Sequence, residues 1–199
     1  MEEKKPVGMP DDVWEHVRNL KNENVNVKVS AAEALGMIGH ESAVPHLIKA
    51  LEDEDDFVRW SAAEALGMIG HKSAVPHLAQ TLKNDENEHV RWSAAVALGE
   101  IGHKSAVPHI IKALKDKNEL VRRGAAYALG RIGHKSAVPH LAQTLKNDEN
   151  EHVRWVAAVA LGEIGHKSAI PHLEQALKDK NEDVRSVAAR ALDMIKRKK

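Results

Sequence analysis

Two stretches of 32 residues decide the fold of this chain. Residues 71–102 read HKSAVPHLAQTLKNDENEHVRWSAAVALGEIG, and residues 134–165 read HKSAVPHLAQTLKNDENEHVRWVAAVALGEIG. They match at 31 of 32 positions and differ only where Ser93 stands against Val156. Looser copies of the pattern recur, with the segment LGxIGH ending at residues 40, 71, 103, 134 and 166. Such a period is typical of a solenoid of stacked repeats. The alternation of 31 and 32 marks a 63-residue unit, duplicated in a natural gene or assembled from modules.

Each repeat predicts a pair of helices. In the first type, such as residues 56–69, apolar residues recur three or four positions apart and form one face. Asp55 places a negative charge at the N-terminus of this helix, where it complements the helix dipole. Gly70 is the predicted C-cap of the same helix. The second type, such as residues 73–84, has Pro76 in its first turns, where a missing N–H is best tolerated. It ends in the polar turn KNDENE.

Neither type of helix buries its apolar face alone, so neighbouring repeats must stack. The chain divides into an N-terminal capping helix at residues 1–23, five repeats at residues 24–182, and a C-terminal capping helix with a basic tail at residues 183–199. We therefore expect one continuous all-α domain. Its architecture is an alpha-alpha superhelix, a solenoid of about twelve helices in six stacked layers.

Composition narrows the function classes. Lys plus Arg number 29 and Asp plus Glu number 29, so no net charge attracts nucleic acid or an anionic membrane. The lack of Cys rules out disulfides and thiolate metal sites. The first 25 residues contain no apolar run typical of a signal peptide, and no stretch approaches the roughly 18 apolar residues of a membrane span. We expect a cytoplasmic protein with neither nucleic acid nor membrane as partner.

The repeated segment VRxxAAxALGxIGxxxAVPxL resembles the HEAT-like repeats of the phycobilin-lyase type. It is also similar to the artificial alphaRep proteins built on that consensus. The resemblance covers roughly residues 24–196. It implies a helical scaffold whose first-type helices line a concave face that contacts partners. Such repeats occur in bilin lyases, a hydroxylase and engineered binders, so the fold alone does not define the function.

The sequence lacks the residues that support catalysis in one member of this fold. In deoxyhypusine hydroxylase, His-Glu pairs on the first-type helices hold a di-iron centre. The matching pairs here offer no such ligands: Trp60-Ser61, Trp92-Ser93, Arg123-Gly124 and Trp155-Val156. The chain also lacks a P-loop, a GxGxxG motif and an HExxH motif. We expect no enzymatic activity, no catalytic residue and no cofactor.

Ten of the thirteen His residues form five pairs, at positions 40/46, 71/77, 103/109, 134/140 and 166/172. Zinc needs three or four ligands around one ion, whereas equivalent His residues in successive repeats should lie about 10 Å apart. We interpret them as solvent-facing turn residues and expect no metal site. The alternative is an adventitious Zn or Ni site along the ridge of the solenoid.

Two other residue types recur once per repeat. A Ser is predicted to act as N-cap or turn residue where each second-type helix begins. The family often has Asp, a better helix-start residue, at the position where this chain has the preceding His. These Ser residues are Ser42, Ser73, Ser105, Ser136 and Ser168. The Arg of each VR pair is predicted to tie one turn to the next through carboxylates and carbonyls.

Five of the six aromatic residues fall on one stripe of the first-type helices, about 100° round from the core face. This stripe varies most between repeats, so the fold leaves it free. The resemblance implies that it lines the concave face. The predicted partner-binding residues are Phe57, Trp60, Glu64, Met68, His89, Trp92, Val96, Glu100, Arg123, Tyr127, Arg131, His152, Trp155, Val159 and Glu163. The alternative is that the Trp residues pack flat between neighbouring helices and cover small residues.

These observations favour a non-enzymatic scaffold that binds a protein, either another chain or its own copy, on the concave face. Two alternatives stay open. One is a bilin-lyase-like or chaperone-like subunit that handles a prosthetic group, and the other is an engineered repeat scaffold without a natural partner.

Overall fold

The computed structural model describes residues 4–197, so the outermost parts of the two predicted caps, residues 1–3 and 198–199, lie outside the described residues. The described part contains twelve α-helices, five short 3₁₀ turns and no strand, which confirms the all-α prediction. The first-type helices are α2 (Val25–Ile38), α4 (Asp56–Ile69), α6 (Glu88–Ile101), α8 (Glu119–Ile132), α10 (Glu151–Ile164) and α12 (Glu182–Arg197). The second-type helices are α1 (Asp11–Asn19), α3 (Val44–Ala50), α5 (Val75–Asn84), α7 (Val107–Ala113), α9 (Val138–Asn147) and α11 (Ile170–Ala176).

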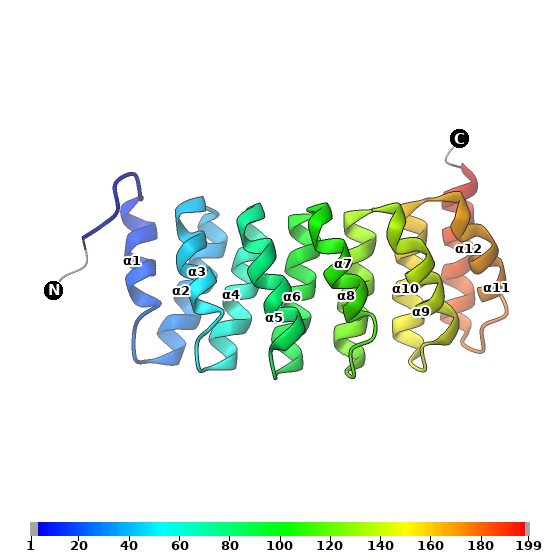
Figure 1. The fold of residues 1–199 in the computed structure, drawn as a ribbon, viewed down its shortest axis with the longest axis horizontal. Helices are drawn as coiled ribbons and strands as arrows, with labels where there is room; N and C mark the ends of the chain where they lie inside the picture. Colours follow the sequence, from blue (N-terminus) through cyan, green and yellow to red (C-terminus); the bar gives the residue numbers. More distant parts are fainter. Residues whose placement is uncertain (1–3, 198–199) are drawn as a thin grey trace.

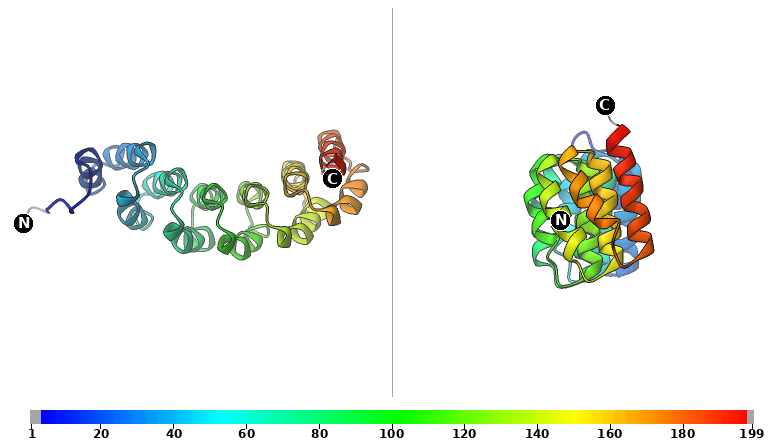
Figure 2. Two further views of the ribbon diagram at one scale, coloured as in Figure 1. Left: turned by 90° about the horizontal axis from the view of Figure 1, so that it is seen from above. Right: turned by 90° about the vertical axis from the view of Figure 1, so that its right-hand side faces the viewer.

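The helices stand side by side in an elongated stack, with the two ends of the chain at opposite ends (Figure 1). Seen from above, the stack forms an arc (Figure 2). The row of first-type helices from α2 to α12 lies on the inner, concave side of the arc, and the second-type helices from α3 to α11 lie on the outer side (Figure 2). None of the described helices is long and apolar enough to cross a membrane.

The first-type helix α4 begins and ends where the sequence predicts, and α12 begins one residue before the predicted C-terminal cap. In α4 the Asp55 carboxylate accepts hydrogen bonds from the amides of Phe57 at 2.9 Å and Val58 at 3.4 Å. Gly70 ends the helix in the left-handed conformation with φ 72°, a region that costs glycine little. Asn replaces Asp as the N-cap in α2, α6, α8 and α10, and a left-handed Gly follows each of these helices.

The second-type helices begin differently from the prediction. Residues 72–74 form a 3₁₀ turn, and α5 starts only at Val75. The N-cap of this turn is His71, whose Nδ1 accepts the Ser73 amide at 3.3 Å and lies 2.8 Å from the Ser73 Oγ. The predicted N-cap role of Ser was wrong, because the imidazole reaches the amide two residues ahead as an Asp side chain does. The alternative role as a turn residue is confirmed, since Ser73 lies within the 3₁₀ turn. The other four turns have the same arrangement.

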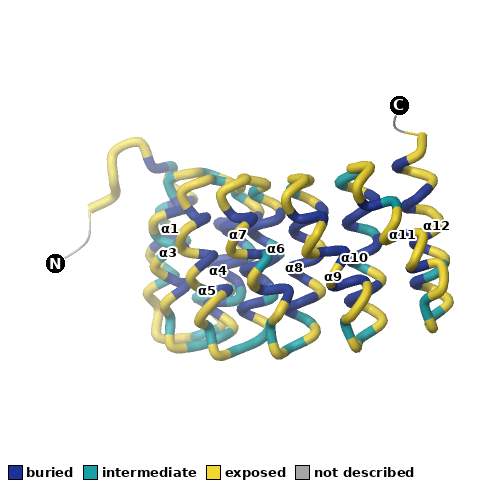
Figure 3. The backbone as a smooth tube through the Cα atoms, turned by 45° about the vertical axis from the view of Figure 1, so that its right-hand side comes forward, coloured by how far each residue is buried: buried dark blue, intermediate teal, exposed yellow. Residues whose placement is uncertain are grey.

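A ladder of fully buried Leu and Ile side chains runs between the two rows of helices. Its rungs are Leu35, Leu66, Leu98, Leu129 and Leu161 from the first-type helices, and Leu47, Leu78, Ile110, Leu141 and Leu173 from the second type. These residues belong to one continuous core, and buried residues follow one another along the whole stack (Figure 3). Each layer therefore completes the core of the next. Full burial of one side chain of this size stabilises the fold by about 1.5–3 kcal/mol.

Arginine clamps join successive turns, as predicted. Arg91 donates from Nε and Nη2 to the Asp116 carboxylate at 2.9 and 3.0 Å, and from Nη1 to the carbonyls of Asp85 and Glu86. Arg59, Arg122 and Arg154 make the same bidentate pairs with the Asp of the next turn. Since these guanidinium groups are almost fully buried, the clamps are part of the core rather than surface ion pairs.

Candidate protein-interaction surface

The fifteen predicted binding residues lie on α4, α6, α8 and α10, the helices on the inner side of the arc; we call them the concave stripe. None of the fifteen is buried. Four large apolar or aromatic side chains of the concave stripe are well exposed: Phe57 at 63%, Met68 at 57%, Trp155 at 42% and Tyr127 at 40%. The inner side of the arc therefore presents large apolar groups to solvent.

The Trp residues differ in how deeply they sit. Trp92 is half-buried, packs against the core, and places its Cδ1 only 2.7 Å from where a Cβ on Gly124 of the next helix would lie. One repeat earlier, Ser93 of α6 takes the place next to Trp60 that Gly124 takes next to Trp92. The Ser93 hydroxyl donates a hydrogen bond to the Trp60 carbonyl at 3.3 Å. Trp92 thus combines the two interpretations offered by the sequence, because it covers a small residue between helices and still leaves part of its ring accessible.

Two carboxylates of the concave stripe, Glu64 and Glu100, repel each other. Burial raises the pKa of Glu64, and the negative charges of Glu100 and Glu33 raise it further. Burial also raises the pKa of Glu100, against the lowering effect of Arg131. Glu33, on α2, was missed by sequence reasoning although it lies 31 residues before Glu64, one repeat earlier, and Met37 was missed at the same offset from Met68.

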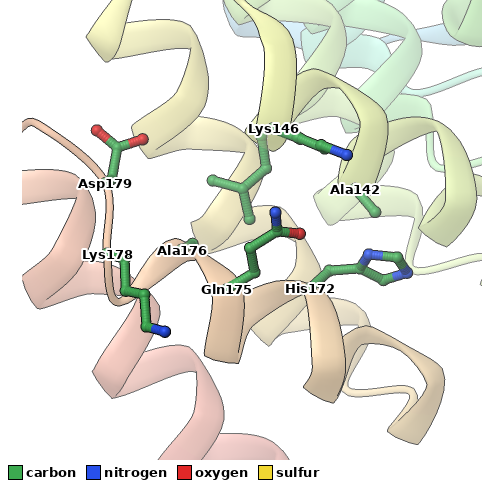
Figure 4. A pocket seen from close by; sticks show the side chains of 8 residues that line it. Ala142, Lys146, His172, Gln175, Ala176, Lys178 and Asp179 are labelled. Carbon is green, nitrogen blue, oxygen red and sulfur yellow. The ribbon is translucent and has the colours of Figure 1, made fainter.

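Hollows in the surface are shallow. One hollow of about 480 Å³ lies between α10 and α12, next to the concave stripe, and is lined by Glu151, His152, Trp155, Asn181 and Asp183. On the outer row, a hollow of about 280 Å³ lies between α9 and α11 (Figure 4), and a smaller one occupies the equivalent place between α5 and α7. Both outer hollows are open to solvent and rimmed by Lys side chains, unlike the enclosed apolar pockets that hold small ligands.

Among the described residues, no group of three His, Cys, Asp or Glu side chains is arranged to hold a metal ion. The five capping imidazoles use Nδ1 for the turn they cap, which leaves only Nε2 for any other contact. That the chain binds no metal stays a prediction.

The repeated helix pairs, the continuous core and the open concave face define a helical repeat scaffold. Three segments of the chain, residues 16–98, 75–158 and 138–199, match the HEAT-repeat family, and the protein belongs to that family. No curated protein sequence matches the chain.

Solved structures with the same architecture include natural and designed proteins. The complex of CpcE and CpcF of phycocyanin lyase from Nostoc sp. PCC7120 is 28% identical, with a TM-score of 0.70 over 98% of this chain and 82% of that chain. Human deoxyhypusine hydroxylase is 24% identical, with a TM-score of 0.57 over 95% and 86%. A designed armadillo repeat protein in complex with the peptide (KR)4 is 22% identical, with a TM-score of 0.69 over 93% and 100%. The last two show the fold alone.

Proposed function

We propose that the protein is a non-enzymatic scaffold that binds a segment of a partner protein along the concave stripe. The observation that carries this proposal is the exposure of Phe57, Met68, Tyr127 and Trp155 on one open face of a structure whose other large apolar residues are mostly buried. Aromatic side chains in such positions are the usual hot spots of interfaces. The designed neighbour that binds a peptide supports the proposal only as an example of this architecture.

Selection from a random peptide library displayed on phage tests the proposal without assuming the partner. The concave variant is Phe57→Ala/Tyr127→Ala/Trp155→Ala, which leaves the more deeply seated Trp60 and Trp92 in place. Loss of hot-spot contacts worth about 2 kcal/mol or more should weaken the selected peptides about 30-fold or more.

A matched control carries three changes on exposed residues of the outer row, Gln80→Ala/Gln143→Ala/Leu177→Ala. We expect this control to bind the selected peptides as the wild type does. Peptides that bind the concave variant and the wild type equally, or a library that yields no binder, would contradict the proposal.

A second candidate is a bilin-handling subunit, favoured by the 28% identity to the phycocyanin lyase complex over nearly the whole chain. Incubation with a linear tetrapyrrole or haem, followed by an absorbance scan, tests it. An unchanged spectrum would remove this candidate. The expected cytoplasmic location and a second copy of the chain as partner stay predictions.

A further inference from the structure

Three glutamates gather on the N-terminal half of the concave face. Glu33 and Glu64 occupy the same position in successive first-type helices, α2 and α4. Glu100 of α6 lies with its carboxylate directly over Gly67 of α4. Both Glu33 and Glu100 act on the charge of Glu64, which places the three carboxylates within electrostatic reach of one another.

The Lys and Arg residues of the same helices form ion pairs with Asp residues outside this cluster. Lys28 of α2, Arg59 of α4 and Arg91 of α6 are the only Lys or Arg residues in these helices. Each is paired with the Asp of a following turn, at 2.7, 2.8 and 2.9 Å. The positive charge of Arg131 on α8 acts on Glu100. Glu33 and Glu64 therefore have no cation of their own helices to neutralise them.

The carboxylates stand among exposed apolar side chains rather than on a purely solvated face. Met37 is 72% exposed, Phe57 63% and Met68 57%, on the same two helices as Glu33 and Glu64. Exposed apolar groups gathered on one face of a helical row indicate a contact surface. Beyond them, α8 contributes the cations Arg123 and Arg131, and the next carboxylate of the concave stripe is Glu163 on α10, so the cluster of three carboxylates ends at α6.

We propose that this half of the concave face binds a cationic and partly apolar peptide segment, in which Lys or Arg alternates with aliphatic or aromatic residues. The inference rests on the proposed function and names the chemistry of the partner. Lys or Arg side chains would donate charge-assisted hydrogen bonds to Glu33, Glu64 and Glu100. The side chains between them would cover Met37, Phe57 and Met68, and like charge would disfavour an acidic segment.

Fluorescence anisotropy with three labelled peptides tests the proposal: alternating Lys-Leu, alternating Glu-Leu and alternating Lys-Ser. We expect the Lys-Leu peptide to bind at least about tenfold more tightly than either of the others, because only it supplies both charge and apolar contact. A Glu-Leu or Lys-Ser peptide that binds as well as Lys-Leu would overturn the inference.

Matched variants separate local recognition from overall charge. Glu33→Gln/Glu64→Gln/Glu100→Gln should weaken Lys-Leu binding about tenfold or more, whereas Glu41→Gln/Glu52→Gln/Glu86→Gln, which changes the net charge equally at exposed residues elsewhere, should leave it unchanged. Equal losses in the two variants would overturn the inference. Circular dichroism checks that both fold, and Glu64→Gln alone provides a milder second variant.

The two proposals fail in different ways. If the Glu-Leu peptide binds most tightly and the change Phe57→Ala/Tyr127→Ala/Trp155→Ala abolishes its binding, the concave face is a binding surface but the inferred partner chemistry is wrong. If the concave variant affects no bound peptide, the proposed function is wrong as well.

Discussion

At the scale of single residues, a glycine in each first-type helix from α2 to α10 determines how closely the layers approach. A Cβ on Gly99 would lie 2.7 Å from the Cα of Ala128 in the next helix. The neighbour here is backbone, so only a shift of the whole helix relieves the overlap. The equivalent glycines of α2, α4, α8 and α10 meet an Ala of the next first-type helix in the same way. These contacts bring the inner row together and favour curvature toward the first-type helices.

We predict that Gly99→Ala lowers the free energy of unfolding by about 2 kcal/mol, because overpacking against backbone outweighs the gain of about 1 kcal/mol in helix propensity. Gly124→Ala is the control, since its added Cβ meets the side chain of Trp92, which can move, and the equivalent residue of α6 is Ser93. Urea denaturation measures both. A Gly99→Ala protein as stable as the wild type would contradict this account of the packing.

The arginine clamps make stability depend on pH in the acid range. Burial tends to raise the pKa of Asp116, but hydrogen bonds from Arg91 and the Asn118 amide, together with the charge of Arg91, bring it below its usual value. A lowered pKa in the folded state stabilises the fold above the unfolded value of about 3.9, and this contribution is lost as pH falls through the folded value.

We predict that Asp116→Asn costs about 3 kcal/mol of stability at neutral pH, because it leaves the Arg91 guanidinium buried without a counter-charge. It should also flatten the fall of stability below about pH 4. Asp193→Asn, which breaks an exposed pair with Arg197 at 3.7 Å, should cost under about 1 kcal/mol. Equal losses at neutral pH would show that the clamp is no stronger than a surface pair.

At the scale of elements, α1 covers the first layer of the stack. Val13 and Val17 are buried against α2 and the turn that precedes α3, while Asp11, Asp12 and Glu15 face solvent. A helix with one apolar and one polar face suits the end of a solenoid, where a repeated helix would leave its apolar side open.

Removal of residues 1–23 should therefore expose apolar side chains of the next layer, lower the melting temperature and cause self-association. Light scattering and thermal denaturation measure both effects. Removal of residues 1–8 alone is the control, because residues 4–8 are exposed and α1 stays in place. If the longer truncation is monomeric with an unchanged melting temperature, α1 is not a cap.

At the scale of the whole molecule, the stack separates its chemistry by face. Capping His residues follow one edge, the arginine clamps follow the turns that lead into the first-type helices, and large exposed apolar groups lie on the inner side of the arc. This regular spacing spreads the His residues along the solenoid instead of gathering them.

We predict well under one Zn, Ni or Fe ion per chain in protein purified without an affinity tag. Zinc requires three or four ligands about 2.0–2.1 Å from one ion, and the described residues contain no group of three candidate ligands. Elemental analysis by mass spectrometry measures the metal content. Stoichiometric metal that survives dialysis against a chelator would reopen the His pairs as ligands.

Much of the fold follows from the sequence because it depends on local periodicity. The α4 boundaries at Asp56 and Ile69 and the glycine C-caps follow from patterns within about fifteen residues. The repeat length follows from identical segments that recur along the chain. The arginine clamps were also predictable, because the acidic turns recur at the repeat period. The candidate surface could be traced as a stripe by helical geometry, without knowing how deep each side chain lies.

Only the tertiary structure decided the features that depend on distances between layers. It placed Trp92 over Gly124 and brought Glu33 within electrostatic reach of Glu64. The cap at His71, by contrast, is a local contact with the Ser73 amide that the sequence analysis assigned to Ser73. The physical reason is that the sequence periodicity indicates which face of a helix a residue occupies, but not how far that face lies from the next helix. The separation and angle of packed helices, set here by glycine and alanine contacts, determine which faces meet and which stay open.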